Sequence, residues 1–295
     1  MIEDASERAG PGHGGVCVTG ATSPVAAFLL PRLRREGYPV YALGRRVAAG
    51  VDADGVAWCR AELEGGSPLP AMAGLTTLVH LAPLWLLPPR IEAFARMGVR
   101  RVIAFGSTSR FTKQDSASVA EQALAARLAG AEAALAGACG EHSLVWTLFR
   151  PTLTYGSGRD GNIAFIARVV RRYGVFPLAA PATGRRQPVH ADDLAAACIA
   201  ALECPATQDR AYNLPGGETL SYRRMVEAVF AACGRAPRFV SLPPTAWRLA
   251  LGALSLWPRA PRIGLEMVAR MNTDMVFDLE DAQRDFGYSP RPFQP

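Results

Sequence analysis

The fold is decided by VCVTGATSPVA, residues 16–26. The run from Val16 to Thr19 has the apolar character of a buried strand. A glycine turn follows at Gly20, and Ser23 with Pro24 is a favourable pair for the cap and first position of a helix. The stretch therefore predicts a strand, a tight turn and a helix that begins near Pro24.

Outward from this stretch, apolar runs alternate with helical patterns, which is typical of a parallel sheet covered on both faces. Strands are predicted at 16–19, 40–43, 78–81, 102–105 and 144–149, and helices at 24–36, 89–97, 117–138 and 191–203. We predict an α/β fold with a Rossmann-type doubly wound parallel sheet and a smaller, mostly helical C-terminal substrate domain. The predicted parts are a disordered leader at 1–15, a nucleotide-binding domain at 16–155 and 188–216, and a substrate-binding cap at 156–187 and 217–295.

The glycine turn is a candidate nucleotide site. A strand that turns sharply into a helix brings backbone N–H groups and the positive end of the helix dipole against a pyrophosphate. The candidate contacts are Gly20, Thr22, Ser23, Pro24 and Val25. An ordinary turn between a strand and a helix is the alternative, because one degenerate glycine turn is a weak signal.

The second strand ends in Gly44-Arg45-Arg46, where NAD-binding proteins place an acidic residue for the ribose hydroxyls. Arg45 and Arg46 suit a 2′-phosphate, so the sequence favours NADP over NAD. Two exposed arginines at a strand end are the alternative.

Composition excludes several classes of protein. The net charge is +6, but Lys113 is the only lysine and the arginines are spread along the chain, so we expect no nucleic-acid partner. The six cysteines show no metal-binding spacing, and we expect no metal and a reducing, cytoplasmic location.

The apolar stretch 245–257 is too short to span a membrane, and we interpret it as a buried helix or a peripheral contact with a membrane or partner.

Seven segments in order carry a more specific signal. They are TGATSPVA at 19–26, VHLAP at 79–83, FGSTSRF at 105–111, FRPTLTYG at 149–156, RQPVHADDLA at 186–195, YNLPGGE at 212–218 and DFGYSPRPF at 285–293. Together they resemble the NAD-dependent epimerase/dehydratase family, the extended short-chain dehydrogenases/reductases, which mostly act on nucleotide sugars. The resemblance covers about residues 15–293.

The resemblance implies roles for several residues. Ser107 matches the residue that hydrogen-bonds a substrate hydroxyl, and Asn162 and Arg186 fall where relatives hold the substrate's diphosphate, although Asn162 equally suits a loop cap. Further cofactor contacts are implied for Glu62, Leu63, His80, Leu81 and Ala82 on the adenosine side, and for Pro151 and Tyr155 beside the nicotinamide.

The family's catalytic pair is absent. Relatives use a Tyr whose phenol is made more acidic by a Lys four residues later, whereas Ser109 precedes the single Lys113 by four residues. Alignment on Glu132 puts Leu124 and Leu128 at the two positions. The candidate substitutes are Ser107, Thr108, Lys113 and Tyr155, with Ser107 and Thr108 as the catalytic candidates.

Two main functions fit this pattern. The first is an NAD(P)-dependent oxidoreductase or epimerase that acts on a nucleotide-linked sugar or similar small molecule through a non-standard catalytic site. The second is a non-catalytic dinucleotide-binding module used in assembly or sensing. The leucines of 117–138 suit either the core or a homodimer contact, and RNA binding rests on the isoelectric point alone.

Overall fold

An eight-stranded sheet is the centre of the computed structural model, which describes residues 13–47, 49–158, 160–242, 247 and 265–295. The strand order is β12-β7-β6-β5-β1-β2-β4-β3, and every neighbouring pair is parallel except β3 with β4. The strands are β1 (Gly15–Thr19), β2 (Val40–Gly44), β3 (Gly50–Val51), β4 (Ala57–Arg60), β5 (Leu75–His80), β6 (Arg101–Phe105), β7 (Val145–Pro151) and β12 (Arg210–Leu214). The predicted doubly wound parallel sheet is therefore confirmed.

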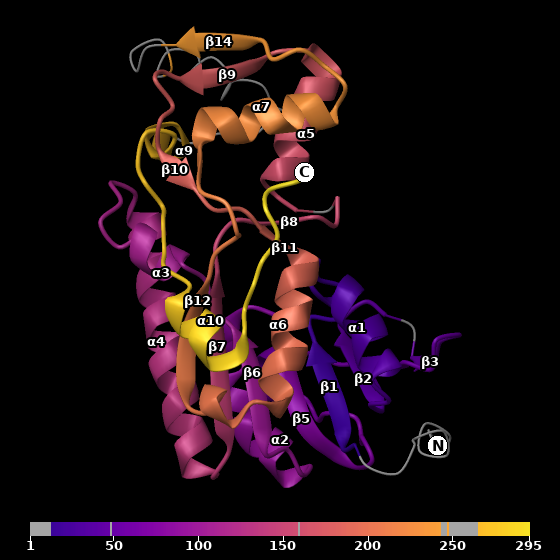
Figure 1. Ribbon diagram of the computed structural model, residues 1–295. Helices are drawn as coiled ribbons and strands as arrows, with labels where there is room; N and C mark the ends of the chain where they lie inside the picture. Colours follow the sequence, from indigo (N-terminus) through magenta and orange to yellow (C-terminus); the bar gives the residue numbers. More distant parts are fainter. Residues whose placement is uncertain (1–12, 48, 159, 243–246, 248–264) are drawn as a thin grey trace.

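Helices cover both faces of this sheet (Figure 1). One face packs on α1 (Ala26–Arg35), α6 (Ala191–Glu203) and α10 (Glu280–Phe286), and the other on α2 (Ile91–Arg96) and α4 (Val119–Glu141). Successive strand residues alternate between the two cores, as Val16 and Val18 do on one side and Cys17 on the other. Leu135 of α4 is buried in the core on this second face.

A third apolar core lies above the carboxyl ends of the strands, in the part that we call the cap (Figure 1). The cap contains α5 (Ile163–Tyr173), β9 (Phe176–Ala179), α7 (Tyr222–Ala232), β14 (Phe239–Leu242) and α9 (Leu265–Arg270). Short pairs connect it to the sheet, namely β8 (Thr154–Tyr155) with β11 (Val189–His190), and β10 (Arg185–Arg186) with β13 (Leu220–Ser221). The chain enters the cap, returns through α6 and β12, and enters it again.

Short helices complete the described fold. They are α3 (Ser109–Thr112) and the 3₁₀ turns η1 (Glu64–Gly66), η2 (Leu84–Leu86), η3 (Pro88–Arg90) and η4 (Pro205–Thr207). No helix among the described residues is long and apolar enough to cross a membrane. The predicted apolar helix at 245–257 lies outside the described residues except for Trp247, which is buried in the cap core.

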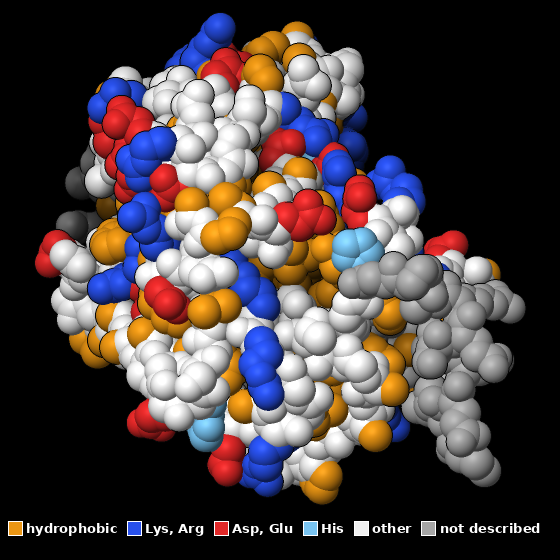
Figure 2. Space-filling view, turned by 60° about the horizontal axis from the view of Figure 1, so that its bottom comes forward, with side chains coloured by type: hydrophobic (Ala, Val, Ile, Leu, Met, Phe, Trp, Pro, Cys, Tyr) orange, Lys and Arg blue, Asp and Glu red, His pale blue; other side chains and the backbone are white. Residues whose placement is uncertain are grey.

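The distribution of charge follows the sequence. On the face drawn in Figure 2, the Lys and Arg side chains are dispersed among acidic, apolar and other side chains, and they do not merge into one basic surface. This face offers no broad electrostatic footprint for a nucleic acid.

Candidate functional site

Two connected chambers lie where the parallel strands end. The larger, which we call the polar chamber, has a volume of about 640 Å³, and the smaller, the apolar chamber, about 410 Å³. Both are lined by Pro24, Ser107, Ser109 and Thr154. Pro24 follows β1 and Ser107 follows β6, so the chambers occupy the crevice at the carboxyl edge where α/β sheets bind their ligands.

The glycine turn forms one wall of the apolar chamber. Gly20 has φ +67°, and a Cβ there would meet the backbone N of Ala82 at 2.6 Å and the carbonyl C of Leu81 at 2.7 Å. Only glycine therefore lets this turn lie against the end of β5. Ser23, Pro24 and Val25 line the chamber beside Leu81 and Ala82.

Helix α1 begins at Ala26, two residues after the start predicted near Pro24, and Val25 and not Ser23 holds the cap position. The Ser23 hydroxyl still accepts a hydrogen bond from the N–H of Ala26, and its carbonyl accepts one from Ala27. The hydroxyl thus satisfies one of the free N–H groups at the start of the helix. Thr22 is exposed at the tip of the turn.

His80 supports this wall from behind. It is fully buried, its Nδ1 lies 2.7 Å from the Thr19 hydroxyl, and its Nε2 lies 3.2 Å from the Pro83 carbonyl. Burial lowers the pKa of His80 to about 4, so the ring is neutral and bridges β1 to the turn after β5. Leu81 and Ala82, but not His80, line the chamber.

The predicted adenosine contacts lie at the far side of the same edge. Arg45 and Arg46 follow β2 and are exposed, and neither has an ion-pair partner among the described residues. Glu62 is exposed and Leu63 half-buried, directly after β4. Because β2 and β4 are neighbours, the structure brings these four residues to one end of the crevice.

The apolar chamber has no proton-transfer pair. Leu124 and Leu128, one helical turn apart on α4, line it together with Leu84 and Trp85. Arg127, between them in sequence, stacks on the Trp85 ring at 4.0 Å from the centroid and does not line the chamber. The positions that the resemblance assigns to Tyr and Lys therefore present aliphatic side chains to the chamber.

Ser107 and Thr108 lie where the chambers meet. The Thr108 hydroxyl donates to the Pro151 carbonyl at 3.1 Å, whereas the Ser107 oxygen accepts from the N–H of Ser109 at 3.1 Å. The Ser107 hydroxyl is therefore oriented by the turn and still has a proton to donate. Neither residue has a side-chain base among its described hydrogen-bond partners.

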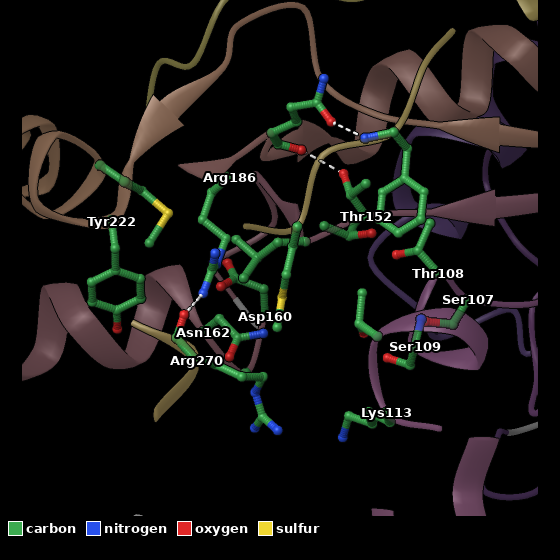
Figure 3. Close-up of a pocket in the computed structure, with 18 of the residues that line it drawn as sticks. Ser107, Thr108, Ser109, Lys113, Thr152, Asp160, Asn162, Arg186, Tyr222 and Arg270 are labelled. Carbon is green, nitrogen blue, oxygen red and sulfur yellow. Dashed lines mark hydrogen bonds between the residues drawn. The ribbon is translucent and has the colours of Figure 1, made fainter. Parts of the chain in front are cut away.

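Arg186 supplies a buried positive charge to the polar chamber. Its guanidinium donates to the carbonyls of Arg185 and Thr273, both at 2.7 Å, and to that of Arg270, but to no carboxylate in the described part of the chain. Burial lowers the pKa of Arg186 to about 10, which leaves it charged at neutral pH. Figure 3 shows it pointing into the chamber, with Tyr222 on one side.

Asn162 and Arg186 both appear among the residues that line the polar chamber (Figure 3). The capping role that the sequence also allowed is filled by Asp160, whose carboxylate accepts from the N–H of Ala164, while Asn162 makes no side-chain cap bond. Both residues line the polar chamber.

Sequence reasoning missed Glu121, Arg270 and Tyr222. Glu121 of α4 binds Lys113 at 3.0 Å and Arg270 of the cap, and both cations line the polar chamber. Tyr222 lines it as well, and burial raises the pKa of its phenol to about 12. No local spacing connects Glu121 to Arg270, so only the fold reveals this pair.

Tyr155 and Pro151 separate in the structure. Pro151 lines the apolar chamber, whereas Tyr155 lines a different pocket, and its hydroxyl accepts from the N–H of Gln294 at 3.0 Å. Burial raises the pKa of Tyr155. Tyr155 is not among the lining residues of either chamber. The described residues contain no cluster of three or more His, Cys, Asp or Glu that could hold a metal ion.

Comparison with known proteins agrees with the geometry. Residues 90–214 match the model of the NAD dependent epimerase/dehydratase family, which confirms the resemblance. A solved structure, MoeE5 in complex with UDP-glucuronic acid and NAD, has the same fold, with a TM-score of 0.70, 19% identity and 95% of each chain covered.

Two curated relatives are similar in sequence. The uncharacterized protein y4nG of Sinorhizobium fredii is 31% identical over 204 residues, which is 68% of this chain and 50% of that protein. The 2-alkyl-3-oxoalkanoate reductase of Stenotrophomonas maltophilia is 28% identical over 165 residues, 52% of this chain and 49% of the reductase. The chain thus spans about half the length of these two relatives.

Proposed function

We propose that the chain, whose residues 90–214 match the model of the NAD dependent epimerase/dehydratase family, binds NADP and a nucleotide-linked sugar or a similar anionic substrate. It would act as an oxidoreductase or epimerase with a non-standard catalytic site. The observation that carries this proposal is Arg186, a buried cation without a carboxylate partner among the described residues, in a chamber joined to the glycine-turn chamber. A buried charge without a counter-ion is costly unless a ligand supplies one.

The residues present fit a dinucleotide. The turn at Gly20 and the start of α1 suit a pyrophosphate, and the apolar chamber suits a flat ring. Arg45 and Arg46 are exposed at the other end of the crevice, which supports a preference for the 2′-phosphate of NADP. When bound, the nicotinamide ring would accept or donate a hydride.

The chain's own residues would then position the substrate. Arg186 and Asn162 would hold its diphosphate, and the Ser107 hydroxyl would donate a hydrogen bond to the oxygen at the reacting carbon. Leu124 and Leu128 can neither take nor give a proton. The proton that the reacting oxygen gains or loses would therefore exchange with solvent through the polar chamber. Loss of general acid–base help costs about 10²- to 10⁴-fold in rate, so we expect slow turnover.

Titration with NADPH and with NADH, followed by fluorescence, tests the cofactor assignment. Tight NADPH binding is expected. When UDP-sugars are added at substrate concentrations to the protein loaded with NADP⁺, cofactor reduction or sugar interconversion is expected. Binding of neither dinucleotide would refute the proposal.

The second candidate function is a non-catalytic dinucleotide-binding module. Leu124 and Leu128 in the apolar chamber favour it, because they remove both members of the catalytic pair and leave the dinucleotide wall intact. Tight NADPH binding without any spectral or chemical change across a panel of UDP-sugars would establish this module in place of the enzyme.

A further inference from the structure

A third cavity, of about 590 Å³, lies in the cap outside both chambers. We call it the arginine pocket, because Arg168, Arg171 and Arg172 of α5 line it. It shares only Asp160 with the polar chamber and shares no lining residue with the apolar chamber. The reaction proposed above makes no use of it.

Helix α5 separates the two cavities by presenting different faces to them. Phe165 and Ile166 face the polar chamber. Ala164, Arg168 and Arg172, spaced four residues apart, face the arginine pocket. The opposite wall is Val229, Ala232 and Cys233 at the end of α7. The pocket is therefore a built cleft between two helices of the cap.

The acidic side chains in the lining do not balance the charges of this pocket. Arg168, Arg171 and Arg172 are exposed and form no ion pair within the described residues. Asp160 is the one acidic side chain in the lining, and it accepts from Ala164 at the start of α5. Pro295, the last residue of the sequence, lines the pocket as well.

Repulsion between these arginines costs free energy in the folded protein. The dipole of α5 favours cations in its last turn, which accounts for Arg171 and Arg172. It does not account for Arg168, which lies mid-helix and repels Arg172 four residues away.

The lining combines these cations with an apolar surface. Ile163, Ala167 and Val229 line the same pocket and offer aliphatic groups to it. Guanidinium groups bind phosphate oxygens in pairs, and several converging on one site suit a group with more than one negative charge. We propose that the arginine pocket binds a phosphate monoester whose apolar body lies between α5 and α7.

Isothermal titration with hexyl phosphate, in the presence of saturating NADPH, tests the proposal on the full chain. Binding is expected for hexyl phosphate, weaker binding for inorganic phosphate, and none for hexanol. Each buried methylene should strengthen binding by about fourfold. Equal affinity for hexyl phosphate and inorganic phosphate would refute the apolar part, and equal affinity for hexyl phosphate and hexanol would refute the anionic part.

Two double variants test whether hexyl phosphate binds in the arginine pocket. Arg168→Ala with Arg172→Ala should weaken hexyl phosphate binding at least tenfold and leave NADPH binding unchanged, because neither residue lines the chambers. The matched control is Arg224→Ala with Arg284→Ala, which removes two exposed arginines elsewhere and should have no effect. Unchanged binding in the first double variant would overturn the proposal.

Two further measurements test the apolar side of the pocket and a membrane source of the phosphate group. Ala232→Trp should fill the apolar side and weaken hexyl phosphate but not inorganic phosphate. Vesicles of phosphatidic acid in phosphatidylcholine test whether a membrane lipid supplies the same phosphate group. Binding to these vesicles without binding of soluble hexyl phosphate would contradict a ligand held inside the arginine pocket.

Discussion

Glu121, near the start of α4, binds Arg270 of α9 through both carboxylate oxygens. The same carboxylate binds Lys113 and accepts from the Ser116 hydroxyl at 2.8 Å. Burial alone would raise the pKa of Glu121, but the hydrogen bonds from Lys113, Ser116 and Arg270 outweigh it and lower the pKa to about 2. One acidic residue thus fastens the sheet to the cap on the rim of the polar chamber.

Replacement of this residue, Glu121→Gln, should lower the free energy of unfolding at pH 7 by about 1–2 kcal/mol, between the values for exposed and buried pairs. The folded pKa lies below the unfolded one, so the stabilisation is present above about pH 4.5 and is lost as the pH falls towards 2. Urea unfolding of both proteins at pH 7 and pH 3 measures this. A difference that does not shrink at pH 3 would contradict the ion pair as its source.

Gly20→Ala should remove dinucleotide binding and destabilise the fold. The change adds about 1–2 kcal/mol of backbone strain at φ +67° and a further cost of about 1–3 kcal/mol from the contact with Ala82. Gly37→Ala is the matched control, because Gly37 has φ +84° with nothing within 4 Å and so carries only the strain. Thermal unfolding and NADPH titration of the two variants compare them. Equal losses would show that the close approach to Ala82 is unimportant.

Arg45→Asp should weaken NADPH binding roughly ten- to hundredfold and leave NADH binding nearly unchanged, because it removes charge-assisted hydrogen bonds to the 2′-phosphate. Fluorescence titration with both dinucleotides measures the ratio. Arg96→Ala serves as the control for a lost surface charge, since Arg96 pairs only with Glu92 on the exposed side of α2. Equal weakening of NADPH and NADH would rule out 2′-phosphate recognition by Arg45.

His80 should make stability depend on pH between about 4 and 6.5. The unfolded chain takes up a proton on His80 near pH 6.5, but the folded chain does so only near pH 4. Stability should therefore fall as the pH drops through this window, by about 3 kcal/mol in total. Chemical unfolding from pH 7 to 4.5 measures the slope, and the slope should be smaller in His80→Asn. An unchanged slope in that variant would assign the effect to other groups.

Ser107→Ala should abolish any turnover and leave NADPH affinity unchanged, because the Ser107 hydroxyl offers a proton where the chambers meet and accepts from the N–H of Ser109. Thr108→Val is the informative comparison, since the Thr108 hydroxyl is already used on Pro151 and its loss should affect stability more than rate. Single-turnover measurement of NADP⁺ reduction by UDP-sugars distinguishes the two. Equal rates in Ser107→Ala and the parent protein would remove Ser107 from the reaction.

The sheet was predictable because each of its elements is specified by a short local pattern in the sequence. The run from Val16 through the turn to α1 has a strand pattern, a glycine and a helix start in sequence, and the structure keeps all three. Predicted helix ends differ from the observed ones by a few residues, as for α4, which begins at Val119 and ends at Glu141. Strand β4 was missed because its four residues, Ala57–Arg60, are too few to show a period.

The site was predictable only in part. Motif order led to Ser107, Asn162 and Arg186, and all three line the polar chamber. The contact of Glu121 with Arg270 joins residues 149 positions apart, and no spacing rule reaches that far. Tyr155 follows the motif in sequence but packs edge-on against Phe293, which a linear pattern does not reveal.

The twofold passage of the chain into the cap sets an order on its assembly during synthesis at the ribosome. Strand β1 lies in the middle of the sheet, so it can pair with β2 and then β5 while later segments are still being made. The polar chamber is completed later, because Arg270, Met275 and Phe277 are part of its lining. A nascent chain that already holds the glycine turn in place would therefore gain this chamber only after residue 277 has left the exit tunnel.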